Sequence, residues 1–180
     1  MLLTKLYSYT VGCLRAFPCI VSLASLLFAV IFQNKVSLLF GIYFLILDIL
    51  SGLFKGVVRS LYSFLGVETL PIIGAGKRPN GAKYCGCFID ENNLEGISKS
   101  FGMPSGHSIL AIFTATFWSL YILDNYPNNW RRTISLIVLN IICFSVCLSR
   151  IYLGCHTIQH VIVGILIGYF LGKKIYSLNF

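Results

Sequence analysis

The stretch TISLIVLNIICFSVCLSRIYL, residues 133–153, decides the fold of this chain. It is almost wholly apolar until it reaches Ser149 and Arg150 near its end. A helix that crosses a bilayer needs roughly 17 to 25 mostly apolar residues. We therefore expect residues 133–153 to form a membrane span that carries a charged residue close to one edge of the bilayer.

Four further apolar windows flank this span, at residues 14–32, 36–54, 107–123 and 157–172. Hydrophobic residues make up 57% of the chain and charged residues only 11%, a balance outside that of ordinary soluble domains. The sequence therefore predicts an all-α fold, a polytopic membrane helix bundle. Since no internal repeat or linker is found, residues 1–180 are expected to form a single membrane-embedded domain.

The segment 55–73 leaves the number of spans open at five or six. It is apolar enough to approach the membrane, yet it carries Lys55, Arg59 and Glu68. It is therefore expected to be either a sixth span or an interfacial helix. The first apolar window has no convincing small-residue cleavage site, so we expect an uncleaved anchor.

The formal net charge of +8 comes from basic residues that lie mostly between the apolar windows. Such loops meet anionic lipid headgroups, so membrane lipids are the expected partners and nucleic acid is not. The long loop 74–106 and the junction 150–156 fall on one face of the membrane. The turn 124–132, with two arginines, and the tail after 172, with two lysines, fall on the other. The positive-inside tendency then predicts that the long loop faces the lumen or the exterior.

The seven cysteines give a weaker signal. In the polar loop, Cys85 and Cys87 are expected either to be oxidised or to bind metal, although no second pair completes a zinc site. The remaining five lie within or beside apolar windows and are expected to behave as small hydrophobic residues. They are Cys13, Cys19, Cys143, Cys147 and Cys155.

All three histidines, His107, His156 and His160, lie at predicted span ends on the face of the long loop. Arg78 and Arg150 fall on the same face, and ionisable groups at a membrane boundary are costly enough to suggest a function. Guanidinium groups present forked donors that match phosphate oxygens in pairs. A neutral histidine can attack phosphorus and a charged one can protonate a leaving alkoxide. This set of residues therefore predicts phosphoryl transfer.

The residues just before His107 are expected to form an anion-binding site. Ser105 and Gly106 precede the helix that is expected to begin near His107. The first backbone N–H groups of a helix have no partner within the helix and point toward any anion placed there. Ser105 and Gly106 are therefore candidate phosphate-binding residues.

Three ordered motifs resemble those of the type 2 phosphatidic acid phosphatase superfamily, which includes lipid phosphate phosphatases and dolichyl diphosphatases. The family patterns are Lys-x6-Arg-Pro, Pro-Ser-Gly-His and Ser-Arg-x5-His-x3-Asp. Here Lys77-Arg78-Pro79 supplies the Arg-Pro of the first pattern. The second pattern is complete from Pro104 to His107, and Ser149-Arg150 with His156 match the third through its histidine.

The resemblance implies that His156 is a nucleophile that forms a phosphohistidine and that His107 is the general acid. It implies no metal and no other cofactor. The expected substrate is a lipid phosphate, first a polyisoprenyl diphosphate, because Phe101-Gly102-Met103 is similar to dolichyl diphosphatases, and then phosphatidic acid. The residues that would bind the phosphoryl oxygens are Arg78, Ser105, Gly106 and Arg150.

Two positions depart from the family patterns. Pro71 stands where the lysine of the first motif is expected, so that lysine is either Lys77, next to Arg78, or Lys55. His160 stands where the third motif has Asp, four residues after His156. A spacing of four on a helix puts both histidines on one face, so a neutral His160 is expected to accept the His156 N–H. Gln159 is a second candidate for this orienting role.

Three other functions compete with a phosphatase. His156 and His160, with His107, have a spacing that also suits a zinc site. Ser105 with His156 suits an intramembrane serine protease, although the arginines then have no role. The missing lysine and carboxylate also allow an inactive membrane scaffold of the same fold.

Overall fold

The structure is a computed structural model that describes residues 2–70, 74–82, 85–86 and 101–180, with side chains from residue 6 onward. Five long helices dominate it: α1 (Leu2–Phe32), α2 (Lys35–Leu65), α4 (Gly106–Asn125), α5 (Trp130–Tyr152) and α6 (Ile158–Asn179). A minimal antiparallel sheet, β1 (Thr69–Leu70) and β2 (Gly74–Ala75), follows α2. The all-α prediction is confirmed.

Five helices in the described part of the chain are long and apolar enough to cross a membrane. The segment 55–73 is not a separate span, because residues as far as Leu65 simply continue α2. Gly66, with a φ of 64°, then ends the helix in the left-handed conformation that glycine adopts without steric cost. The interpretation of 55–73 as a sixth span is therefore wrong.

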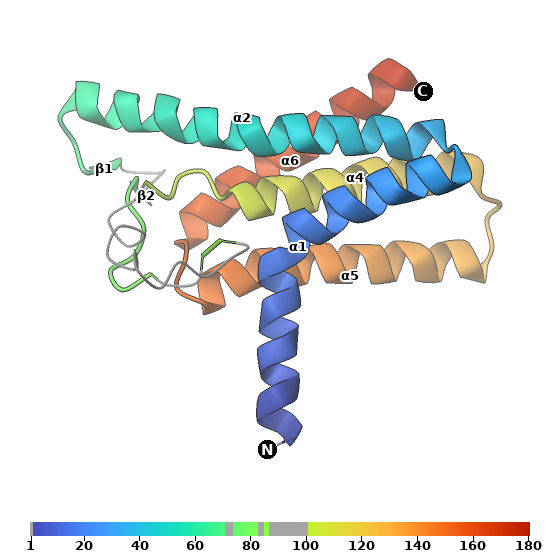
Figure 1. Ribbon diagram of the computed structural model, residues 1–180. Helices are drawn as coiled ribbons and strands as arrows, with labels where there is room; N and C mark the ends of the chain where they lie inside the picture. Colours follow the sequence, from blue (N-terminus) through green and yellow to red (C-terminus); the bar gives the residue numbers. More distant parts are fainter. Residues whose placement is uncertain (1, 71–73, 83–84, 87–100) are drawn as a thin grey trace.

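The helix α4 lies at the centre of the bundle, and α6 packs closely along it (Figure 1). Gly164, Gly168 and Gly172 recur every four residues on the α6 face that meets α4. A Cβ at Gly164 would lie 2.7 Å from the Ser105 carbonyl oxygen, and one at Gly172 would lie 2.8 Å from Thr116 Cβ. Small residues let two membrane helices approach closely, so this spacing fixes α6 against the start of α4.

An aromatic core joins α2 to the centre of the bundle. The Phe40 and Phe113 rings are stacked with centroids 5.5 Å apart, and Phe40 also contacts Phe117. Phe117 in turn meets Tyr176 of α6 edge to face. Phe40, Phe113 and Phe117 are fully buried, so this core holds α2, α4 and α6 as one unit.

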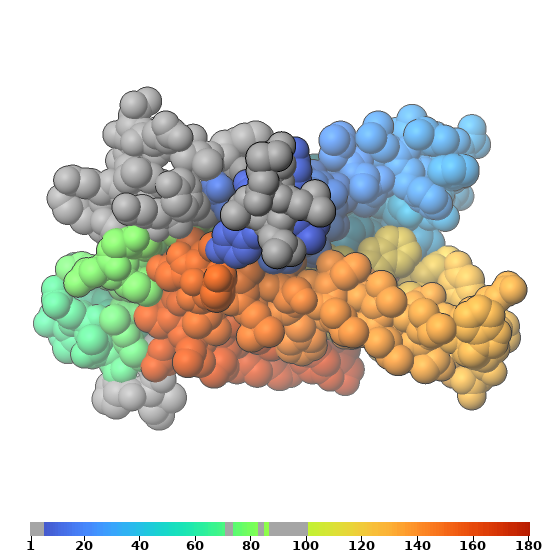
Figure 2. All heavy atoms as spheres, turned by 90° about the horizontal axis from the view of Figure 1, so that it is seen from below, coloured from blue at the N-terminus to red at the C-terminus, as the bar shows by residue number. Residues whose placement is uncertain are grey.

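The first helix bends sharply, and its early part leaves the bundle (Figure 1). Pro18 lies inside α1, and an interior proline removes a helical hydrogen bond and kinks the helix. In Figure 2, which is seen from below, this early part (dark blue) lies beside α5 (orange). The helix begins before the apolar window predicted at residue 14, because the preceding residues continue the helical turn.

Candidate active site

The three motifs meet at one end of the bundle, where α4 and α6 begin, α5 ends and the sheet lies (Figure 1). His107 lies in the first turn of α4, Arg150 in the last turn of α5, and His160 in the first turn of α6. His156 lies in the connection between α5 and α6. Residues far apart in the sequence are therefore gathered on a single membrane face, as predicted.

Arg78 and His156 make the central contact of this cluster. Arg78 Nη1 lies 3.1 Å from His156 Nε2 and donates at 3.0 Å to the Cys155 carbonyl oxygen. Because a guanidinium group has only donors, His156 Nε2 must accept this hydrogen bond. The proton of the neutral imidazole is therefore on Nδ1, and the Nε2 lone pair faces the arginine.

His156 is only 3% exposed. Burial lowers the pKa of the imidazole well below its usual range, and the nearby positive charges of Arg78 and Lys55 lower it further. The ring is therefore neutral at physiological pH. A neutral imidazole with an available lone pair is the form that acts as a nucleophile.

The turn after α5 fixes His156 through the backbone. The Arg150 carbonyl oxygen accepts from the N–H groups of Cys155 and His156, at 3.0 and 3.1 Å. Gly154 provides the left-handed conformation that this reversal needs, with a φ of 65°. The Arg150 side chain is fully buried, and its Nε and Nη2 both donate to Ser149 Oγ at 3.1 Å. The Ser-Arg part of the motif therefore positions a buried cation next to the His156 turn.

Ser105 and Gly106 form the start of α4, as the sequence predicted. Ser105 is the N-cap residue, and its backbone N–H donates to the His160 carbonyl oxygen at 3.0 Å. A Cβ at Gly106 would lie 3.0 Å from Ser51 Oγ and 3.8 Å from Lys55 Nζ. The absence of a side chain at Gly106 lets Lys55 approach the N-terminus of α4.

His107 is held by α1. Its Nε2 lies 3.0 Å from the Arg15 backbone carbonyl oxygen, which can only accept, so Nε2 carries a proton. The other ring nitrogen, Nδ1, is the one left for chemistry at the site. Pro18, three residues after Arg15, kinks α1 at this point, and a proline kink opens neighbouring carbonyls to outside donors. Nothing in the sequence indicated that α1 would contact His107.

His160 lies beside His156, but the predicted hydrogen bond between them is not formed. The two rings meet edge to face with centroids 5.6 Å apart, and neither Nδ1 atom has a partner among the described residues. The His160 Nε2 atom instead donates to the Ala75 carbonyl oxygen of β2. The expectation of a shared helical face was wrong because α6 begins only at Ile158, after His156. The exposed Gln159 packs against Gly74 instead.

The two candidate motif lysines lie in different surroundings. Lys77 is exposed, and its Nζ pairs with the exposed Glu68 carboxylate at 2.9 Å, which lowers the pKa of that carboxyl. Lys55 is half-buried, faces the start of α4 and is close enough to lower the pKa of His156. The structure therefore brings Lys55 to the cluster and leaves Lys77 paired with Glu68.

A disulfide joins Cys85 to Cys155, across a sequence separation of 70 residues. Cys155 was predicted to be a free, inert residue, and that prediction is wrong. Of the two alternatives left open for Cys85, oxidation and metal binding, the structure shows oxidation, while Cys87 lies outside the described residues. Since Cys155 precedes His156, the bond ties the Arg78 loop to the His156 turn. Cys155 lies beside an apolar window, and nothing in the sequence around it indicated that it pairs with Cys85.

A mostly apolar groove of about 360 Å³ runs beside the cluster between α1 and α5. It reaches Ser149, whose hydroxyl accepts from the Arg150 guanidinium. The groove therefore leads from the side of the bundle toward the buried arginine. Its walls are formed by Tyr7, Thr10, Val11 and Leu14 of α1 with Ser145, Leu148, Ser149 and Tyr152 of α5, and by Leu153.

The competing metal interpretation finds no support in the described ranges. They contain no group of three or more His, Cys, Asp or Glu side chains placed to hold a metal ion. The Nε2 atoms of His107 and His160 both contact backbone carbonyls instead.

Residues 23–180 match the model of the PAP2 superfamily, and the chain belongs to this superfamily. It is also similar to the dolichyldiphosphatase of Saccharomyces cerevisiae (strain ATCC 204508 / S288c), at 34% identity over 99 residues. The alignment spans 54% of this chain but only 40% of that relative. No solved structure matches the chain. The resemblance seen in the sequence motifs is thus confirmed at the level of the family.

Proposed function

We propose that this protein is a membrane-embedded lipid phosphatase that forms a phosphohistidine at His156. The contact between Arg78 Nη1 and His156 Nε2, at 3.1 Å, carries the proposal. It puts a nucleophilic lone pair next to a cation whose geometry suits phosphoryl oxygens. A phosphate that enters between them would take the arginine donors and meet the Nε2 lone pair at the same point.

In the first step, His156 Nε2 attacks phosphorus and the bond from phosphorus to the leaving oxygen breaks. Arg78, Arg150 and Lys55 stabilise the charge on the other oxygens, together with the first N–H groups of α4. His107 donates the Nδ1 proton to the leaving oxygen. The Arg15 carbonyl oxygen accepts from Nε2, so Nδ1 is the ring atom that exchanges the proton.

In the second step, water attacks the phosphohistidine. His107, now neutral, takes a proton from that water, and the bond between phosphorus and His156 Nε2 breaks to release phosphate. The same two histidines thus serve both halves of the reaction, and the proton returns to His107 at the end. No step is assigned to a metal ion.

We propose that His160 replaces the family carboxylate as the partner of His156. The tautomers are complementary, because His156 Nδ1 carries a proton and His160, which donates through Nε2, has its lone pair on Nδ1. A modest rotation of either ring would join them. A neutral partner orients the nucleophile but adds no negative charge, so we expect a slower enzyme than one with Asp.

The groove between α1 and α5 supports a long-chain substrate. It is mostly apolar, lies between the early part of α1 and the end of α5, and leads to Ser149 and Arg150. An isoprenoid chain in this groove would bring its phosphate to the buried arginine. Together with the similarity to a dolichyldiphosphatase, this favours a polyisoprenyl diphosphate over phosphatidic acid.

The disulfide supports an active site on the lumenal or extracytoplasmic face. Disulfides persist in oxidising compartments and are rare in the reducing cytosol. The Cys85–Cys155 bond lies at the end of the bundle that holds the histidines. This agrees with the orientation inferred from the arginines and lysines of the other end.

A phosphate-release assay on the purified protein tests the proposal. The panel consists of a polyprenyl diphosphate, phosphatidate and a soluble sugar phosphate, each with wild type and His156→Ala. We expect release from the polyprenyl diphosphate and a loss of at least about 1,000-fold in the variant. A ³²P label trapped in wild type and absent from His156→Ala would identify the intermediate. Equal release from both proteins would contradict the mechanism, and no release from either would support the scaffold.

A further inference from the structure

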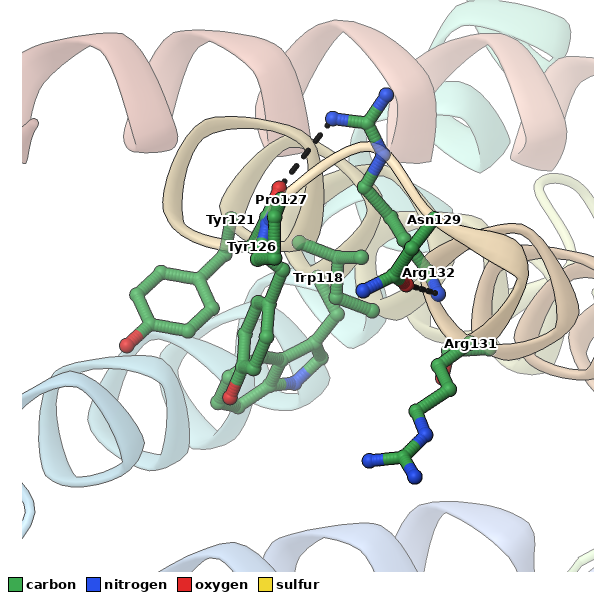
Figure 3. A pocket seen from close by; sticks show the side chains of 9 residues that line it. Trp118, Tyr121, Tyr126, Pro127, Asn129, Arg131 and Arg132 are labelled. Atoms are coloured by element: carbon green, nitrogen blue, oxygen red, sulfur yellow. Dashed lines mark hydrogen bonds between the residues drawn. The ribbon is translucent and has the colours of Figure 1, made fainter.

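A second cavity lies at the opposite end of the bundle, where α4 turns into α5. It has a volume of about 560 Å³ and is lined by aromatic and basic side chains, among them Trp118, Tyr121, Tyr126, Arg131 and Arg132. Figure 3 shows the aromatic rings on one side of this space and the two arginines, at the start of α5, on the other. None of these residues belongs to the three motifs.

The two arginines of this pocket make contacts within the turn between α4 and α5 and at the start of α5. Arg132 Nη1 donates to the Leu123 carbonyl oxygen at 3.4 Å. It also donates to the Tyr126 carbonyl oxygen at 3.3 Å, as Figure 3 shows. Arg131 lies over the Trp130 ring, with the guanidinium carbon 5.5 Å from its centroid. The arginines are therefore fixed at the membrane boundary by contacts of different kinds, while both remain cationic.

The acidic residue nearest in sequence does not neutralise this pocket. Asp124 accepts a hydrogen bond from Tyr176 of α6 at 2.7 Å and does not line the cavity. The lining side chains thus include two cations and no carboxylate. An anion is the complementary ligand.

The cavity adjoins an apolar groove of about 410 Å³ between α1, α2 and α4. The two spaces share Trp118, Tyr121 and Tyr126, and the groove then passes Phe28 and Phe40. A basic pocket at the boundary that opens into an apolar groove within the spans has the polarity of a phospholipid. Aromatic residues at such a boundary are typical of the headgroup level.

We propose that this pocket and groove bind one anionic phospholipid of the leaflet opposite the active site. The headgroup phosphate lies between Arg131 and Arg132, and one acyl chain follows the groove past Trp118 and Phe40. The arginine-bearing turn faces the cytoplasm in the orientation inferred above, and the cytoplasmic leaflet carries the anionic lipids. The proposal is independent of the phosphatase activity.

The two tryptophans of the chain make a direct test available. Trp130→Phe leaves Trp118, which lines both spaces, as the single tryptophan. This protein, purified in neutral detergent, is titrated with phosphatidylglycerol that has brominated acyl chains, and separately with brominated phosphatidylcholine. Bromine quenches tryptophan fluorescence only at close range. We expect half-maximal quenching at about a 30-fold lower mole fraction of the anionic lipid, because two basic residues at roughly 1 kcal/mol each give about 2 kcal/mol.

Two variants in the Trp130→Phe background identify the site. Arg131→Gln with Arg132→Gln should abolish the preference for the anionic lipid. Lys173→Gln with Lys174→Gln removes the same charge from the same end of the molecule, outside the pocket, and should keep the preference. If the double arginine variant is unstable, Arg131→Gln alone spares the bonds of Arg132 to the turn and should weaken the preference. Equal quenching by both lipids, or an equal loss in the lysine variant, would overturn the proposal.

Discussion

The two ends of the bundle use arginine in opposite ways. At the end with the histidines, Arg150 is fully buried and Arg78 donates to both a backbone carbonyl and an imidazole. At the other end, Arg131 is exposed and stacks on an aromatic ring. A buried cation is retained only where its donors have fixed acceptors, whereas an exposed one tolerates loose contacts. Substitutions at the first end should therefore act on chemistry and those at the second on lipid contacts.

The largest difference is expected between the two lysines of the histidine end. Lys55→Met removes a half-buried charge that faces the start of α4, and we expect kcat/KM to fall about 100-fold. Lys77→Met removes only an exposed pair with Glu68, and we expect a change of less than about twofold. The rate of phosphate release by each variant shows which of the two lysines is the motif lysine. If Lys77→Met proves the more damaging variant, the motif lysine has been assigned wrongly.

The next largest effect is expected at the disulfide. Reduction, or Cys85→Ser with Cys155→Ser, frees the Arg78 loop from the His156 turn, and we expect about a tenfold loss of kcat. Closing a loop of this length also stabilises a protein by up to about 4 kcal/mol, so the melting temperature should drop as well. Cys143→Ser is the matched control, because Cys143 is a buried free thiol within α5. Full activity of the reduced protein would show that the loop holds its position without the bond.

A smaller effect is expected at His160. The variant His160→Asp supplies the charge of the family pattern and should retain or raise turnover by a few fold. The variant His160→Ala should lower kcat more than KM, since it removes the partner that we propose for His156 Nδ1. A complete loss of activity in His160→Asp, measured on well-folded protein, would contradict the orienting role.

The smallest effect concerns pH. The pKa of His156 is lowered in the folded protein. When the pH falls below about 6.5, this histidine is therefore protonated in the unfolded chain while it stays neutral in the folded protein. The stability contribution of neutral His156 is therefore complete above that pH and is lost below it, by at most about 1.4 kcal/mol per pH unit. Chemical unfolding at pH 7.5 and pH 5.5 should show this loss in wild type and a smaller one in His156→Gln. If the free energy of unfolding depended on pH identically in both proteins, His156 would not be the group that causes this loss of stability.

Much of this arrangement could be predicted from the sequence, and the reasons are physical. Apolar windows identify spans because the bilayer imposes their length, and span order alone puts the three histidines on one face. Arg78, Arg150 and His107 are candidates because few other residue types can supply the chemistry of phosphoryl transfer. Such constraints are local, so they are visible in the sequence.

The parts that sequence reasoning missed depend on contacts between distant segments. Nothing near Cys155 indicates that its partner is Cys85, and nothing near Arg15 indicates that its backbone carbonyl holds His107. The choice between Lys55 and Lys77 also required the structure, because it depends on how α2 packs against the start of α4. The orientation of His160 was misjudged because His156 was taken to be part of the helix, whereas α6 begins at Ile158.

The disulfide between Cys85 and Cys155 also makes the molecule a covalent ring with two tails. The ring contains all of α4 and α5. Arg78 and His156 lie just outside it, on the two chain segments that lead away from the disulfide. A cut at any peptide bond inside the ring would therefore leave one molecule on a non-reducing gel and two fragments after reduction. His156 and Arg78 would stay tethered to each other through the disulfide even in such a nicked chain.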